Sequence, residues 1–147
     1  MDYAGFSLNN MTTLALALSV GAVILSTGFD EYDAARKYPF GYGRYENVVT
    51  SIQFERLLSA SVPYEGHVRR PSDKAEPKRV AFIQCVGSRD LQYGNGYCSG
   101  VCCMYAVKES IIAKEHASDM DITMFYMDIR AYGKGFDAYY TEAREKH

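Results

Sequence analysis

The stretch Arg79-Val-Ala-Phe-Ile-Gln-Cys-Val-Gly-Ser-Arg-Asp90 decides the expected fold of this chain. Its first six residues, 79–84, form an apolar run that predicts a buried strand. The strand leads directly into Cys85, and a glycine-rich loop follows at residues 93–97. We therefore expect Cys85 at the carboxyl end of a buried strand, which is the edge where open α/β sheets bind ligands.

The residues that follow this loop predict a helix, a strand and a second helix. The helix begins in Cys98-Ser-Gly-Val-Cys-Cys-Met104 and extends to His116, with Glu109 expected to face water. Residues 121–128 predict a strand, and residues 136–146 a final amphipathic helix. This order of elements predicts an α/β fold, specifically a doubly wound domain with a mostly parallel sheet.

The N-terminal half of the chain predicts a strand, a helix and a linker. Residues 20–25 read Val-Gly-Ala-Val-Ile-Leu and predict another buried strand, closed by a small polar turn. Residues 47–60 predict a helix that Thr50 or Ser51 can cap. Residues 61–78 contain three prolines and several charged side chains, so we expect a polar crossover or linker there.

Composition excludes several classes of function. With 147 residues, of which 48% are hydrophobic, the chain can bury the core of one ordinary domain. Its net charge is only -2 and it has no polybasic run, so we expect no nucleic-acid partner. The most apolar stretch, residues 14–25, is short for a transmembrane helix and resembles no secretory signal. We expect a cytoplasmic protein without direct membrane insertion.

The four cysteines form the pattern C-x12-C-x3-C-C, with Cys85, Cys98, Cys102 and Cys103 as its members. Four cysteines are too few for a disulfide-stapled miniprotein, and a bond between two adjacent ones would be strained. Cys85 leaves a strand and the other three surround the start of a helix, so all four are expected to meet at one edge of the sheet. Metal or redox chemistry is therefore the favoured use of these thiols.

Adjacent cysteines favour an iron–sulfur cluster over a zinc ion. Cys103 points about 100° away from Cys102 on a regular helix, so the two sulfurs reach one body only if it is large. A cubane offers several iron atoms as attachment points, whereas zinc needs all four sulfurs about 2.3 Å from one centre. The alternative is that the cysteines are structural residues that pack in the core.

Other candidate site residues carry weaker signals. Only Gly87 remains of a G-x-G-x-x-G dinucleotide motif, which argues against nicotinamide phosphate binding. The three histidines are expected to be exposed. An Arg69–Arg70 pair could hold an anion, although a solvated linker is the favoured interpretation. Asp128 and Arg130, at the end of a predicted strand, are either site residues or an ordinary ion pair.

These segments together resemble the A subunit of heterodisulfide reductase and its relatives, which include the flavoprotein subunits of the quinone-interacting membrane-bound oxidoreductase of sulfate reducers. The resemblance extends over about residues 20–144. The matching blocks are residues 20–29, 47–51, 54–58, 70–73, 79–90, 97–104 and 125–135.

The resemblance implies a fold, two cofactors and a set of partners. The framework of that family is similar to thioredoxin reductase, and Thr27 and Gly28 are then expected to end the strand that returns to bound FAD. Cys85, Cys98, Cys102 and Cys103 are expected to ligate a 4Fe-4S cluster near the flavin. Electrons are expected to pass between FAD and the cluster in methanogenesis, toward ferredoxin, hydrogenase-type electron-transfer proteins and other heterodisulfide reductase subunits.

The chain lacks the glycine-rich FAD fingerprint and the C-x2-C-x2-C-x3-C ferredoxin runs of that family. We therefore expect a part of an oxidoreductase that is inactive alone and binds FAD poorly. Its expected organisation is a partial FAD-domain segment with a return helix at residues 1–60, a linker at 61–78, and a Rossmann-like cluster-bearing segment at 79–147. The alternatives are a docking module with structural zinc or free thiols, and a degenerate NAD(P)-binding domain.

Overall fold

A computed structural model describes residues 21–61 and 64–146 of the chain. The chain divides into two compact units, Met1–Asp30 and Glu31–His147. All helices and strands of the described residues belong to the second unit.

The described part of the first unit, residues 21–30, contains no helix or strand, and all its side chains are exposed. The strand predicted at residues 20–25 is therefore wrong for residues 21–25, whereas Val20 lies outside the described residues. Val23, Ile24 and Leu25 have exposed fractions of 73%, 89% and 83%. A strand is stable only beside a hydrogen-bonded neighbour, and among the described residues the only strands that pair are two in the second unit.

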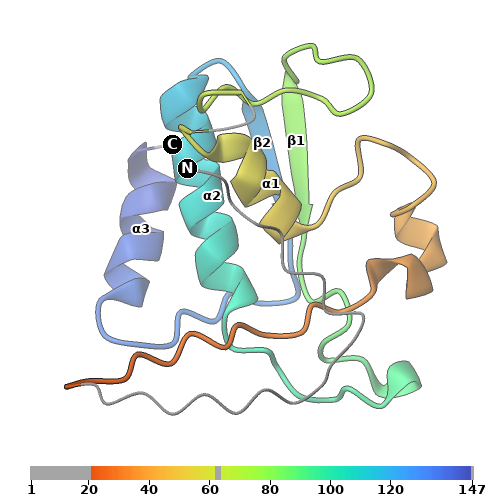
Figure 1. Cartoon of the computed structure of the whole chain (residues 1–147), viewed down its shortest axis with the longest axis vertical. Helices are drawn as coiled ribbons and strands as arrows, with labels where there is room; N and C mark the ends of the chain where they lie inside the picture. Colours follow the sequence, from red (N-terminus) through yellow and green to blue (C-terminus); the bar gives the residue numbers. More distant parts are fainter. Residues whose placement is uncertain (1–20, 62–63, 147) are drawn as a thin grey trace. The chain divides into compact units, whose positions relative to one another are not determined.

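The second unit is built on a two-stranded parallel sheet (Figure 1). Strand β1 (Arg79–Ile83) pairs with β2 (Asp121–Phe125), with Arg79 opposite Asp121. Helix α2 (Cys102–His116) connects them, as a parallel pair requires. The predicted order of strand, loop, helix and strand is thus confirmed as a mixed α/β arrangement.

Residues 79–84 were expected to form a buried strand, but β1 is exposed along one face. Exposure alternates along both strands, and Ile83 and Phe125 are 46% and 58% exposed. Val80, Phe82 and Ile122 point to the opposite face and pack against the core. The sheet therefore buries one face, because the described residues supply helices on that side only.

Helix α1 (Ser51–Leu58) covers the buried face together with α2. Phe54 and Leu58 of α1 are buried, and the Phe54 ring packs edge-on against Phe82 with ring centroids 5.4 Å apart. The core also includes Val68, from the segment between α1 and β1. The helix predicted at residues 47–60 is confirmed over residues 51–58, with Thr50 as its N-cap.

Helix α3 (Phe136–Lys146) packs beside α2, on the side away from α1 (Figure 1). Three short 3-10 turns lie in the loops, η1 (Ala34–Arg36), η2 (Tyr38–Phe40) and η3 (Leu91–Tyr93). No helix within the described residues has the length and apolar character to cross a membrane.

One prediction about α2 is wrong. Glu109 was expected to face water, but its side chain has an exposed fraction of 0%. It lies on the face of α2 that carries Cys102, Ala106 and Ala113, all of which are buried.

Candidate functional site

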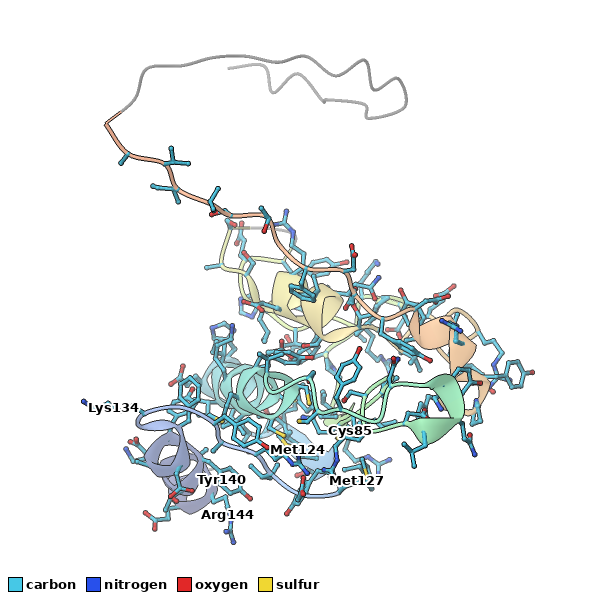
Figure 2. All side chains as sticks on the ribbon, turned by 90° about the horizontal axis from the view of Figure 1, so that it is seen from below. Cys85, Met124, Met127, Lys134, Tyr140 and Arg144 are labelled. Atoms are coloured by element: carbon cyan, nitrogen blue, oxygen red, sulfur yellow. The ribbon has the colours of Figure 1, made fainter. Side chains whose placement is uncertain are left out.

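The four cysteines lie at the edge where β1 and β2 end. Cys85 comes two residues after β1, and the amide of Gln84 still donates to the carbonyl of Phe125, 2.9 Å away. Figure 2 labels Cys85 and also Met127, which follows β2. Because α2 runs back from this edge between two parallel strands, its first residues also lie here.

A closed loop returns the chain from Cys85 to Cys98. The amide of Arg89 donates to the carbonyl of Tyr97 at 2.8 Å, and Asp90 and Asn95 form an antiparallel bridge. The side-chain amide of Asn95 also donates to the carbonyl of Gly87 at 3.0 Å. These bonds hold the two ends of the loop together. Cys85 and Cys98 are therefore neighbours in space, although twelve residues separate them in the sequence.

The remaining cysteines surround the start of α2. The amide of Gly100, a residue with φ of +76°, donates to the sulfur of Cys98 at 3.4 Å. Cys102 and Cys103 occupy the first turn of α2 and are 8% and 4% exposed. Val101 precedes them as the N-cap and makes no side-chain capping bond. All four cysteines are free thiols.

Neighbouring thiols affect the ionisation of Cys85 and of Cys103. Burial raises the pKa of Cys85, and the thiols of Cys102 and Cys98 raise it further, while Arg89 opposes them. Burial also raises the pKa of Cys103, and the thiols of Cys102 and Cys85 raise it further. The structure therefore brings all three of the other thiols close enough to Cys85 to interact with its charge.

This sulfur group is not arranged around one metal ion. Among the residues that the structure describes, no three or more Cys, His, Asp or Glu side chains form a group that could hold a single ion. The donor set consists of sulfur alone, and two of its members are adjacent on a helix. Such a set suits a body with several attachment points better than a tetrahedral zinc ion.

Asp128 and Arg130 form an ion pair beside the cysteines. The Arg130 Nε lies 3.2 Å from the Asp128 carboxylate, which also pairs with Arg89. The hydrogen bond from Arg130, followed by the one from Arg89, holds the pKa of Asp128 below its usual range. The backbone carbonyl of Asp128 accepts a weak bond from the Cys103 thiol at 3.9 Å. The ion pair between Arg89 and Asp128 therefore ties the segment after β2 to the loop after Cys85.

The other predicted site residues do not join this group. His67 and His116 are exposed, as expected, and His147 lies outside the described residues. Arg69 pairs with Glu76 at 3.1 Å, and Arg70 forms a two-point contact with Asp73. These arginines are therefore held by carboxylates within residues 61–78 and are not directed at the cysteines. Thr27 and Gly28 are exposed residues of the first unit.

Gly87 is covered by an aromatic ring instead of being open to a phosphate. It has a φ of +79°, and a Cβ atom placed on it would lie 2.2 Å from the ring of Tyr32. A dinucleotide needs close backbone approach at such a glycine, and the Tyr32 ring occupies that space. This contact argues against the degenerate NAD(P)-binding domain.

Sequence reasoning missed two residues near the site. Tyr32 lies in a loop without periodicity, so no pattern indicated its contact with Gly87. Glu109 could have been found, because it follows Cys102 and Ala106 at helical spacing and precedes Ala113 by four residues. A carboxylate on an apolar helical face is a sign of a buried charge.

Comparison with known proteins identifies the chain by its relatives. No model of a known protein family matches it. It is 50% identical over 132 residues to the A subunit of the H(2):CoB-CoM heterodisulfide,ferredoxin reductase of Methanothermobacter marburgensis, a match covering 90% of this chain and 20% of the relative. The chain is homologous to part of the A subunit of heterodisulfide reductase. This confirms the resemblance inferred from the sequence.

Two further relatives of the same kind extend the comparison. The iron-sulfur A subunit of the CoB--CoM heterodisulfide reductase of Methanocaldococcus jannaschii is 47% identical over 131 residues, which are 89% of this chain and 20% of the relative. The A subunit of the ferredoxin/F(420)H(2)-dependent CoB-CoM heterodisulfide reductase of Methanosarcina acetivorans is 49% identical over 130 residues, 88% of this chain and 16% of the relative. The chain therefore spans about a fifth of the length of the curated relatives it matches.

Proposed function

We propose that this chain is the cluster-bearing electron-transfer segment of a heterodisulfide reductase-type flavoprotein, in which Cys85, Cys98, Cys102 and Cys103 ligate a 4Fe-4S cluster. The observation that carries the proposal is the grouping of four free thiols at one sheet edge, where Cys85 interacts electrostatically with the other three. The names of the relatives, one of which is an iron-sulfur subunit, support it.

The surroundings of the thiols suit a bound cluster. A cluster supplies one-electron redox chemistry, and hydrogen bonds and burial around its sulfur ligands adjust its potential. In this chain the Gly100 amide already donates to the Cys98 sulfur. The guanidinium of Arg89 favours negative charge on Cys85, and burial of Cys102 and Cys103 excludes water. The Gly100 amide and the Arg89 guanidinium would stabilise anionic thiolates, whereas burial would limit the access of water to the cluster.

The finer architecture and the wider role are part of the same proposal. We infer that β1, α2 and β2 form a Rossmann-like unit of a thioredoxin-reductase-like framework, supported by the parallel register with a helical crossover. The segment at residues 1–60 would contribute to FAD binding through Thr27 and Gly28. Electrons would pass between FAD and the cluster, in a cytoplasmic complex with other heterodisulfide reductase subunits and ferredoxin or hydrogenase-type partners.

Anaerobic reconstitution of the whole chain with iron and sulfide tests the cluster assignment. We expect a brown protein with about four irons per chain. Changing any one of the four cysteines to serine should lower the bound iron by at least about half, because each supplies a ligand. Ser99→Ala, a change in the same loop that removes no sulfur, is the matched control and should retain the iron.

Three outcomes would contradict the proposal. A colourless protein with one zinc ion would support a structural zinc site, and a protein that binds neither metal would support the docking module. A cysteine variant that retains the full iron content and visible spectrum would remove that residue from the ligand set.

A further inference from the structure

Glu109 is the only acidic or basic side chain that is buried among the described residues. Its exposed fraction is 0%, and it lies where α2 contacts α1. Figure 1 shows these two helices side by side. Removing a carboxylate from water is costly unless a cation or several hydrogen bonds compensate for the lost hydration.

The compensation at Glu109 is incomplete. Ser51, the first residue of α1, donates through its hydroxyl to the Oε1 of Glu109 at 2.8 Å. The Oε2 atom is buried and has no hydrogen-bond partner among the described residues. Lys108, the neighbouring cation on α2, is 2.8 Å from Glu55 of α1 and forms its ion pair there. Glu109 therefore has one neutral hydrogen-bond donor and no ion pair within the described chain.

The charged and titratable groups around Glu109 favour its neutral form. Burial raises its pKa to about 7, the Ser51 hydrogen bond opposes this, Glu55 raises it further and Lys108 lowers it. Tyr105, one turn earlier on α2, carries no charge near neutral pH, because burial raises its own pKa to about 12 and keeps it a neutral phenol. Protonation near neutral pH is thus supported by the geometry and by the balance of neighbouring charges.

We propose that Glu109 is a reversible proton-binding site and that the bound proton stabilises the contact between α1 and α2. Glu109 also lines a surface groove between the two helices, whose charged lining residues are Glu55 and Arg56 of α1 and Lys108 of α2. Small rearrangements of these side chains connect the carboxyl group to solvent for proton exchange. When Glu109 loses its proton, the single hydrogen bond from Ser51 does not offset the cost of keeping a carboxylate away from water, so the packing of α1 over α2 is destabilised.

The proposal goes beyond electron transfer and does not depend on the cysteines. Glu109 follows Cys103 by six residues along α2, and its contacts are with α1. A movement of α1 that exposes Glu109 to water restores an ordinary carboxyl pKa and releases a proton at neutral pH. Proton binding and the position of α1 are therefore linked thermodynamically.

Two measurements on the whole chain test the site. A carboxyl ¹³C NMR titration should find Glu109 titrating near neutral pH, and Ser51→Ala should raise that pKa by removing a bond to the ionised form. Since the folded pKa is raised, the stabilisation is full below the unfolded pKa and is lost as pH rises through the folded pKa. The unfolding constant should therefore rise by on the order of tens of fold between pH 5 and 8.

Glu109→Gln imitates the protonated carboxyl group and should remove this part of the pH dependence. Glu115→Gln, a change to an exposed carboxylate near the end of α2, is the control and should retain it. A Glu109 that titrates near its ordinary value would overturn the proposal, and so would an unchanged pH dependence in Glu109→Gln. If a variant unfolds without a cooperative transition, the NMR titration decides, and none of these results depends on whether a cluster binds.

Discussion

At the scale of single residues, backbone strain marks the cysteine loop. Cys85 has a φ of +60°, a left-handed conformation that glycine adopts at lower cost. Arg89, four residues later, has a φ of +56°. Strained non-glycine residues persist where the surrounding structure holds them, and they are frequent at functional sites. The strain at Cys85 therefore supports a role for its thiol beyond packing.

Replacing Gly87 by alanine should separate strain from close contact. Gly87 and Gly94 have nearly the same φ, +79° and +77°. At Gly87 the Tyr32 ring occupies the space that a Cβ atom would need, whereas that space is open at Gly94. We expect Gly94→Ala to lower the free energy of unfolding by about 1 kcal/mol, from the backbone alone. Gly87→Ala should cost roughly 1–3 kcal/mol more, because the new methyl group overlaps the ring.

Urea denaturation followed by circular dichroism gives both values. Adding Tyr32→Ala to Gly87→Ala should recover part of the loss, since it removes the overlapping ring. Equal losses at the two glycines would show that the Tyr32 ring moves aside without cost.

At the scale of elements, α1 is short and depends on its N-terminal cap. Eight residues are too few for a helix to be stable alone in water. The amide of Gln53 donates to Thr50 Oγ1 at 3.4 Å, and the amide of Thr50 donates to Gln53 Oε1 at 2.9 Å. This capping box satisfies two amide groups, and packing of Phe54 and Leu58 supplies the rest of the stability.

Thr50→Ala should destabilise the protein by about 1 kcal/mol, because it removes the acceptor for the Gln53 amide. Thr50→Ser retains a hydroxyl group and should cost less than half as much. Thermal unfolding of the two variants beside the parent chain measures the difference. If serine and alanine prove equally destabilising, the hydroxyl group contributes nothing and packing alone holds α1.

At the scale of the whole molecule, the segment between α1 and β1 is part of the core of the second unit. Val68 is 5% exposed and packs in the same cluster as Phe54, Ala113 and Met120. The core lies on one face of the sheet only, while Ile83 and Phe125 remain exposed on the other. A small core of this kind makes each of its members important for stability.

Val68→Ala should lower the free energy of unfolding by about 2 kcal/mol, from two buried methyl groups and the space they leave. Val23→Ala is the matched control, since Val23 is 73% exposed, and it should change stability by less than about 0.5 kcal/mol. Chemical denaturation compares the two. A loss for Val23→Ala as large as that for Val68→Ala would contradict the exposure of residues 21–25.

The elements of the second unit could be predicted because their signals are local. Apolar runs at β1 and β2, the cap at Thr50 and the helical spacing in α2 and α3 depend on neighbours in the sequence. The cysteine pattern and the resemblance to heterodisulfide reductase were also readable at this level, since residue identity and spacing carry them.

Only the tertiary structure shows which predicted strands pair with a neighbour and which elements bury a given side chain. Residues 21–25 have an apolar sequence typical of a strand, yet no described strand pairs with them. Glu109 follows apolar residues at helical spacing, but only the fold shows that α1 is the element that packs over it. The physical reason is that strand pairing and burial depend on contacts between segments distant in sequence, whereas periodicity reports only what each segment can form by itself.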